Sequence, residues 1–240
     1  MKKGGLKILG LALLIIFASV CMVACSTAPK TETQNTAGTY NRTEIITSST
    51  EAKQLLIDGN KRFTENKLLN DDISDTRLKG LSTNGQHPFA VIVSCSDSRV
   101  PPEVIFDQGL GDIFVIRDAG NVIDPVVLGS VEYGAEHLHA PLIAVLGHEG
   151  CGAVKATVDG GETPGSIGAI VEKIKPSMEK AKSTGATSTA LYEKTADENI
   201  KAAIAAIEKS HIIKELLDEK KVKIIGAKYH LETGEVVFSE

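Results

Sequence analysis

Two short stretches of the sequence hold thiol and imidazole side chains directly after apolar runs. Cys95 follows the run 89–93, and His148 and Cys151 follow the run 141–146. Open α/β sheets place their binding crevices at the carboxyl ends of strands, so we expect the two stretches to meet there. Two Cys and one His suit Zn²⁺, and three protein ligands leave a fourth position open, as in catalytic rather than structural zinc sites.

The spacing of these ligands fits a metal centre of that kind. His148 and Cys151 are three residues apart where a strand turns into a helix, so both can reach one ion. Cys95 comes from a different strand, and the pattern therefore requires its loop to be adjacent in the folded sheet. Zinc lowers the pKa of a bound water to about 7 in favourable sites, which makes hydroxide available near neutral pH.

A carboxylate and a guanidinium stand beside the first candidate ligand. Asp97 and Arg99 are two residues apart, so on an extended turn they can form a charge-assisted pair. The carboxylate could accept the proton of zinc-bound hydroxide, or it could close the fourth metal position itself. A purely structural ion pair is the alternative, but the neighbouring metal ligand favours a catalytic dyad.

The first 24 residues have the features of an export signal. Lys2, Lys3 and Lys7 precede an apolar stretch over 8–20, which is too short for a comfortable transmembrane span. Small residues then lead to Cys25, and Met22-Val23-Ala24-Cys25 is similar to a bacterial lipobox. We therefore expect a signal peptide over 1–24 and lipidation of Cys25; an uncleaved anchor and plain secretion are the alternatives.

Residues 25–49 are rich in Thr, Ser and Asn and predict a flexible linker between a membrane anchor and the domain. The expected location is therefore the extracytoplasmic face of the cell membrane, with the periplasm as the alternative. Cys21 leaves with the signal and Cys25 carries lipid, so Cys95 and Cys151 are the thiols of the folded domain. In an oxidising compartment a disulfide between them is the simplest alternative to metal binding.

Composition limits the remaining classes of function. The chain has 240 residues, 42% hydrophobic and 24% charged, enough for one globular domain, which we place at 50–240. The formal net charge is −5, and it is more acidic without the signal, which holds three lysines and no acid. A net basic field for nucleic acid is therefore absent, and we expect no nucleic-acid partner.

Hydrophobic patterns predict alternating strands and helices. The expected strands are 89–94, 113–116, 142–146, 222–231 and 235–238, the last two forming a hairpin at Glu232-Thr233-Gly234. The expected helices are 48–66, a turn at 76–81, 124–140, 151–158, 166–181 with a break at Pro176, and 196–219 with a joint at Ser210. A loop is expected at 183–189. This order predicts an α/β fold: a mainly parallel central β-sheet flanked by helices, with an antiparallel C-terminal edge strand and an N-terminal helical arm.

Residues 86–157 resemble a β-class carbonic anhydrase. Several motifs carry the resemblance in the family's order: Cys95-Ser96-Asp97-Ser98-Arg99-Val100-Pro101, Arg117-Asp118-Ala119-Gly120-Asn121, Glu132-Tyr133 and His148-Glu149-Gly150-Cys151-Gly152. The last strands, with Gly226-Ala227-Lys228-Tyr229 and Glu232-Thr233-Gly234, also resemble the family's final hairpin. The resemblance implies one Zn²⁺ per subunit on Cys95, His148 and Cys151, with Asp97 and Arg99 as the catalytic dyad.

The resemblance also implies a substrate pocket. Gln86 stands nine residues before the first zinc ligand, where the plant-like branch has a substrate-binding glutamine, and Phe114 and Tyr133 match that branch's aromatic residues. The other branch has a Trp at the position of Ile92, in a non-catalytic bicarbonate pocket, and this chain contains no Trp. The sequence therefore predicts the plant-like site, with Val100 and Gly152 as further pocket residues.

The implied reaction is reversible hydration of CO₂ to bicarbonate and a proton, by attack of zinc-bound hydroxide. His87, His137 and His139 are candidate proton shuttles by residue type alone, and ordinary surface or core histidines are the commoner explanation. Family members build their pocket across a dimer, which implies at least a homodimer, with the first helix as an exchanged arm.

Other zinc functions remain as alternatives. Hydrolysis of COS or CS₂ is the nearest, because the same nucleophile could attack either molecule. An alcohol dehydrogenase would need G-x-G-x-x-G after a strand, and a zinc deaminase would need H-x-E followed by P-C-x-x-C; neither motif occurs. A non-catalytic zinc- or thiol-dependent binding protein is disfavoured by Asp97 and Arg99, which such a site does not need.

Overall fold

The computed structural model of the chain describes residues 40, 42 and 44–239. The predicted signal peptide 1–24, the predicted lipidation site Cys25 and most of the predicted linker lie outside the described residues. Within the described part, no helix is both long enough and apolar enough to cross a membrane.

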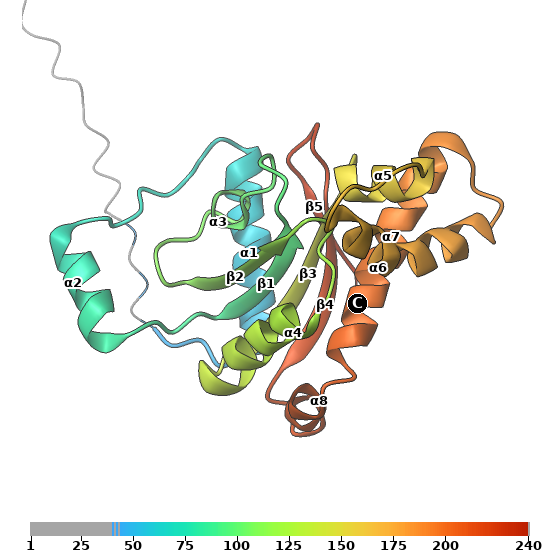
Figure 1. The fold of residues 1–240 in the computed structure, drawn as a ribbon. Coiled ribbons are helices and arrows are strands. Elements are labelled where there is room, and N and C mark those ends of the chain that lie inside the picture. Colours follow the sequence, from blue (N-terminus) through green and yellow to red (C-terminus); the bar gives the residue numbers. More distant parts are fainter. Residues whose placement is uncertain (1–39, 41, 43, 240) are drawn as a thin grey trace, which may run out of the picture. The chain divides into compact units, whose positions relative to one another are not determined.

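A five-stranded sheet with the order β2-β1-β3-β4-β5 organises the described chain (Figure 1). The strands are β1 Ala90–Cys95, β2 Ile113–Asp118, β3 Leu142–His148, β4 Lys223–Tyr229 and β5 Val236–Ser239. The first four are parallel, and β5 pairs antiparallel with β4. Gly234 supplies the positive φ, 75°, that the tight turn between β4 and β5 requires. The predicted mixed sheet with an antiparallel edge strand is confirmed.

The central strands are continuously apolar because helices cover both faces of the sheet. Ala90 and Ile92 of β1 face the side covered by helix α1, Ser49–Thr64. Val91 and Val93 face the opposite side, where they pack with residues of α4, α7 and α8. Both faces of β1 are therefore buried from solvent, which fixes the register of the strand and the position of Cys95 at its end.

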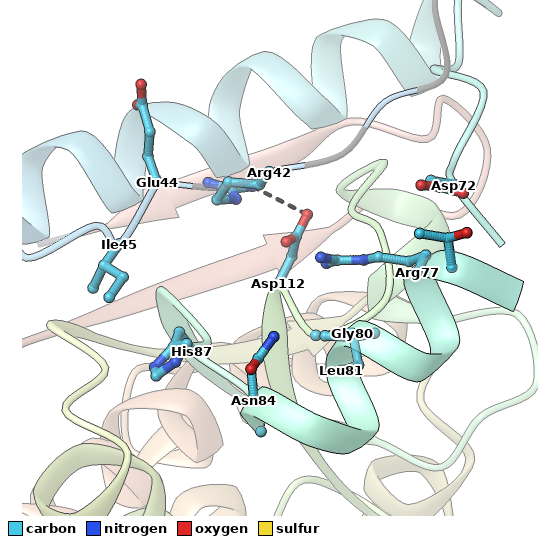
Figure 2. Close-up of a pocket in the computed structure, with 13 residues that line it drawn as sticks. Arg42, Glu44, Ile45, Asp72, Arg77, Gly80, Leu81, Asn84, His87 and Asp112 are labelled. Carbon is cyan, nitrogen blue, oxygen red and sulfur yellow. Dashed lines mark hydrogen bonds and ion pairs between the residues drawn. The ribbon is translucent and has the colours of Figure 1, made fainter. Parts of the chain in front are cut away.

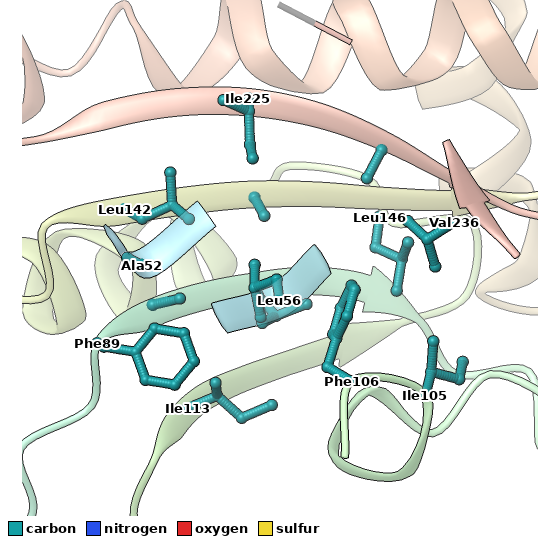
Figure 3. Packing of buried hydrophobic residues seen from close by; sticks show 14 of the residues in the cluster. Ala52, Leu56, Phe89, Ile105, Phe106, Ile113, Leu142, Leu146, Ile225 and Val236 are labelled. Atoms are coloured by element: carbon teal, nitrogen blue, oxygen red, sulfur yellow. The ribbon is translucent and has the colours of Figure 1, made fainter. Parts of the chain in front are cut away.

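Helix α1 packs on the sheet of its own chain. Ser48 caps it by accepting a hydrogen bond from Glu51 N–H. Leu56 is fully buried near Phe106 and Leu146 (Figure 3). Gly59 permits the close approach, since a Cβ there would lie 1.7 Å from the carbonyl oxygen of Phe106. The helical arm therefore forms part of this domain's core.

The remaining helices follow the predicted order, except that α2 is longer than the predicted turn at 76–81 and α3 lies where the sequence pattern predicts no helix. They are α2 Asp75–Asn84, α3 Pro102–Ile105, α4 Pro125–Glu132, the π-helix η1 Tyr133–His137, α5 Gly152–Asp159, α6 Ile167–Lys182, α7 Ser188–Ile207 and α8 His211–Asp218. Asp124 caps α4 through hydrogen bonds from two backbone N–H groups, and Ser210 caps α8. The predicted joint at Ser210 is confirmed.

Two helix predictions are wrong in detail. Helix α6 continues through Pro176, because Pro176 and Glu172 are exposed and water can solvate the carbonyl that proline leaves unpaired. Helix α7 begins at Ser188 rather than at 196, so the predicted loop ends before its last two residues. Burial of Leu191 and packing of Tyr192 beside Cys151 stabilise this first part of α7, and local pattern does not show such long-range contacts.

The compact unit includes residues before the predicted domain start at 50. Ile46 is buried in the core. Arg42 forms an ion pair with Asp112 at 3.2 Å and stacks over the ring of Phe89. These contacts attach the described end of the predicted linker to the domain.

Candidate metal centre

The three predicted metal ligands come from two strand ends and one helix start. Cys95 is the last residue of β1 and His148 the last of β3, two parallel neighbours in the sheet. Cys151 is the N-cap residue of α5. Because parallel strands end at the same edge, the fold brings together residues that are 53 and 56 positions apart in the sequence.

The ligand atoms of Cys95, His148 and Cys151 all lie within 4.8 Å of one another, and the three residues are buried. Both cysteines are free thiols, so the structure does not contain the alternative disulfide. His148 Nδ1 lies 2.8 Å from the carbonyl oxygen of Glu149, to which it must donate. The Nε2 atom is buried and has no hydrogen-bond partner. A lone pair left free beside two thiols fits a Zn²⁺ ion.

Several donors surround the sulfur of Cys95. Hydrogen bonds from Cys151 and from the N–H of Gly120 lower the pKa of the Cys95 thiol, against the opposing effect of burial. The Gly120 nitrogen lies 3.3 Å from the sulfur, and the Asn199 side chain in turn donates to the Gly120 carbonyl at 2.7 Å. The environment therefore favours thiolate at Cys95, the form that binds metal.

Asp97 and Arg99 form the predicted pair. Arg99 donates to Asp97 Oδ1 from Nε at 2.9 Å and to Oδ2 from Nη2 at 2.7 Å, a bidentate geometry. These hydrogen bonds hold the pKa of Asp97 well below its usual range. Asp97 Oδ2 lies 4.0 Å from His148 Nε2. The pair thus places an ionised carboxylate at the open side of the ligand cluster.

Arg117 braces the turn that carries these residues. Its guanidinium donates to the carbonyl of Cys95 at 3.1 Å and to that of Asp97 at 2.7 Å. Asp118, at the end of β2 opposite Cys95, has one buried carboxylate oxygen without a partner, and burial raises its pKa to about 7. The edge of the sheet therefore places a second acid next to the thiols.

Three predicted pocket residues lie at the other end of the sheet. Gln86 is exposed and precedes β1, and Phe114 pairs with Val91 near the start of β2. The rings of Phe114 and Tyr133 are 6.0 Å apart. Since β1 spans roughly 16 Å, these three side chains are far from Cys95 of the same chain. The structure brings them near one another but does not bring them to the metal centre.

The other two predicted pocket residues are close to the ligands in the chain. Val100 is fully buried in the core beneath the Cys95 loop, and its N–H donates to the Asp97 carbonyl. Gly152 is exposed as the first residue of α5, with open space where a Cβ would stand. Their roles in binding substrate stay predictions.

The candidate shuttle histidines are also distant from the ligands in this chain. His87 lines a cavity of about 320 Å³ with Arg42, Arg77, Asn84 and Asp112, at the start of β1 (Figure 2). The cavity mixes both signs of charge. His137 and His139 are exposed near η1, and the His137 ring lies 4.8 Å from that of Tyr133. None of the three contacts Cys95, His148 or Cys151.

The fold and the site together define an α/β protein with a catalytic type of Cys₂His metal centre at the carboxyl edge of a parallel sheet. The family model described as carbonic anhydrase matches residues 90–236. The chain therefore belongs to the carbonic anhydrase family.

Relatives and solved structures agree with this assignment. A carbonic anhydrase of Mycolicibacterium smegmatis is 42% identical over 190 residues, 77% of this chain and 90% of the relative. Carbonic anhydrase 2 of Mycobacterium tuberculosis is 39% identical over 81% of this chain and 94% of the relative. The β-carbonic anhydrase CcaA has a TM-score of 0.64 at 27% identity, covering 79% of this chain and 88% of its own. The Coccomyxa β-carbonic anhydrase in complex with acetazolamide has a TM-score of 0.62 at 27% identity, covering 68% and 77%. The chain is a β-class carbonic anhydrase.

One group at the site is absent from the sequence prediction. Glu193 accepts a hydrogen bond from the N–H of Gly150, between the two ligands of the second motif. It belongs to neither motif, and it lies in the part of α7 that the sequence pattern did not assign to a helix. No local signal marks it, since the contact exists only once α7 packs beside β3.

Proposed function

We propose that this chain catalyses the reversible hydration of CO₂ to bicarbonate and a proton at the cluster of Cys95, His148 and Cys151. One observation carries the proposal: the unpartnered Nε2 of His148 faces two thiols, 4.0 Å from an ionised carboxylate. Zn²⁺ held by these residues would supply a Lewis acid that lowers the pKa of water near neutral pH.

Contacts within the chain hold the ligand residues in this arrangement. Because Nδ1 of His148 donates to the Glu149 carbonyl, the ring cannot turn without losing that bond, and Nε2 keeps its lone pair toward the sulfurs. Donors around Cys95 favour its thiolate. Two thiolates and a neutral imidazole balance the charge of a divalent cation in a buried site.

Asp97 is the hydrogen-bond acceptor in this proposal. Arg99 occupies both carboxylate oxygens, which keeps the group ionised and directs it along one side of the ligand cluster. A carboxylate held by a guanidinium accepts a hydrogen bond from water or hydroxide and so fixes the direction of the oxygen lone pair. This arrangement favours the dyad over closure of the metal site by Asp97.

The active assembly is at least a homodimer in our proposal. Gln86, Phe114 and Tyr133 lie at the opposite end of the sheet from the ligands of their own chain. A second copy can place them beside the ligands, whereas the extended β1 between them prevents this within one chain. Tyr133 is a large exposed side chain on this part of the surface, which fits contact with a second copy.

Stopped-flow CO₂ hydration by the metal-replete protein tests the function. Removal of the metal with a chelator should abolish the activity, and zinc should restore it. Zinc bound at one ion per chain with no activity above buffer would contradict the enzyme and favour a binding protein. Parallel assays with COS and CS₂ test the alternative hydrolase, which gains if either is turned over faster than CO₂.

We also propose that Cys25 is lipidated after removal of the signal peptide and anchors the enzyme outside the cytoplasm. The support is the lipobox-like sequence alone. Mass spectrometry of the protein from bacterial membranes should find two or three acyl chains on an N-terminal Cys25. A Cys25→Ala variant should leave the membrane fraction, and a variant that stays there with an intact N-terminus would show an uncleaved anchor instead.

A further inference from the structure

Glu193, on the second turn of α7, lies against the loop that joins His148 and Cys151. Its Oε1 accepts a hydrogen bond from the N–H of Gly150 at 3.3 Å. Gly150 directly precedes Cys151 and has a φ of 62°. A carboxylate from a distant helix therefore holds the backbone of the loop that carries two metal ligands.

Lys228 on β4 fixes this carboxylate in place. Its Nζ lies 2.7 Å from Glu193 Oε2 and 2.8 Å from Asp197 Oδ1, one helical turn further along α7. Lys228 is the register partner of Gly147, beside the end of β3, and its side chain is 16% exposed. Burial lowers the pKa of Lys228, but hydrogen bonds to Asp197 and Glu193 outweigh it, and the net pKa is raised. The ammonium ion therefore holds Glu193 at the strand end where His148 lies.

The other side of Gly150 is bound to the catalytic pair. Its carbonyl oxygen accepts a hydrogen bond from Arg99 Nη2 at 3.4 Å. The same nitrogen of Arg99 donates to Asp97. A single residue thus connects Glu193 and Lys228 on one side with Arg99 and Asp97 on the other.

We propose that Glu193, held by Lys228, is a positioning residue that fixes the Gly150 backbone and thereby both the metal loop and the orientation of Arg99. The part that concerns Arg99 rests on the proposed function, while the part that concerns metal retention does not. The competing explanation is that these charges only stabilise the packing of α7 on β4.

Two measurements on a Glu193→Ala variant test the proposal. The first is the rate at which a chelator removes zinc, and the second is kcat/KM for CO₂. Groups that orient a metal's ligands contribute 10- to 100-fold, so we expect zinc release about tenfold faster and kcat/KM about tenfold lower than wild type. Glu193→Gln keeps an acceptor for the Gly150 N–H but loses the charge, so its zinc-release rate and kcat/KM should lie between those of wild type and Glu193→Ala. If the alanine variant does not fold, the glutamine variant tests the proposal in its place.

Glu198→Ala is the matched control. Glu198 is on the same helix and pairs with Lys201 at 2.7 Å and with Lys180, and it has no hydrogen bond or ion pair with the metal loop. We expect zinc release and kcat/KM within twofold of wild type. Equal changes in the Glu193 and Glu198 variants would overturn the proposal and indicate a general effect of α7.

A double variant separates positioning from packing. If Lys228 acts by holding Glu193, adding Lys228→Met to Glu193→Ala should cause no further change in zinc release. If Lys228→Met makes zinc release still faster in the Glu193→Ala background, Lys228 does not act through Glu193 and the proposal is overturned. If the wild-type enzyme shows no CO₂ hydration, the proposed function fails, yet the zinc-release comparison still decides whether Glu193 positions the loop.

Discussion

Asp97 shows how one side chain depends on its immediate partners. The bidentate contact with Arg99 lowers the pKa of the Asp97 carboxyl and outweighs burial, which raises it. Arg117 fixes the backbone on either side through the carbonyls of Cys95 and Asp97. Cys95 and the dyad therefore lie on one turn whose backbone Arg117 holds, although Cys95 is a metal ligand and the dyad is not.

Asp97→Asn should separate the role of the dyad from that of the metal ligand. An amide of the same shape carries no negative charge and is a weaker hydrogen-bond acceptor, so turnover should fall by about a hundredfold or more. The metal ligands are untouched, so zinc should stay at one ion per chain. Stopped-flow assays with elemental analysis of the same sample check both values, and a rate close to wild type would reduce the dyad to a structural ion pair.

A second aspartate gives a pH-dependent prediction away from the metal. The Oδ1 atom of Asp71 is buried without a hydrogen-bond partner. Burial raises the pKa of Asp71, and the nearby carboxylates of Asp107 and Asp112 raise it further, while Arg62 acts in the opposite direction. A raised folded-state pKa of a carboxyl group lowers stability as the pH rises from 3.8 through that higher value. Asp71→Asn should therefore increase the free energy of unfolding at pH 7, with a gain that shrinks toward pH 4.

Asp72→Asn is the control for that experiment. Hydrogen bonds from Ser74 lower the pKa of Asp72, so its charge stabilises the fold above the ordinary pKa. Removal of this charge should lower the free energy of unfolding at pH 7, whereas Asp71→Asn should raise it. Urea unfolding of both variants and the wild type at pH 7 and pH 4.5 measures these changes in the free energy of unfolding. If both variants change the stability in the same direction at pH 7, the raised pKa of Asp71 is contradicted.

At the scale of elements, helix α1 contributes both apolar and polar contacts to the core. Leu56 fills the space between the sheet and α3. Asn60 is buried and donates to the carbonyls of Ile105 and Gly234, while its oxygen accepts from Val236 N–H at 2.8 Å. One side chain thus joins α1, the end of α3 and the C-terminal hairpin.

Asn60→Ala should lower the free energy of unfolding by about 2 kcal/mol, because it leaves buried backbone groups without partners. Gln54→Ala, which removes an exposed contact to Asp58 on the same helix, should change it by less than about 0.5 kcal/mol. Urea unfolding of the zinc-bound proteins compares them. If the two variants change the free energy of unfolding equally, the hydrogen bonds of Asn60 do not stabilise the packing of α1.

At the scale of the whole molecule, the two ends of the sheet have different tasks. The carboxyl end holds the metal ligands and Asp97. The amino end holds Gln86 and the pair Phe114 and Tyr133, the predicted substrate-binding residues, which have none of the ligands nearby. In the homodimer that we propose, two copies of the chain would combine both ends into complete sites.

A complementation experiment tests this division. Cys95→Ser lacks a ligand thiolate and Gln86→Ala lacks the amide, so each homodimer should be impaired. A heterodimer isolated with two affinity tags contains one site with all its ligands and a partner's Gln86. In a symmetric dimer its activity should therefore return to about half of wild type. Activity no higher than that of the Gln86→Ala dimer would place Gln86 in its own chain's site or outside the pocket.

The sequence alone determined the residue types at the metal centre, the strands that end there and the starts of several helices. These depend on local chemistry: apolar runs, the helix start near Asp124, the joint at Ser210 and the hairpin turn at Glu232-Thr233-Gly234. Only the tertiary structure decided that His148 keeps Nε2 free, that Glu193 and Lys228 reach the metal loop, and that Gln86 lies far from the ligands of its own chain. The orientation of His148 depends on the path of the backbone after β3, which brings the Glu149 carbonyl to Nδ1. The contacts of Glu193 and Lys228 depend on how α7 packs beside β3 and β4. The distance of Gln86 follows from the length of the extended strand β1.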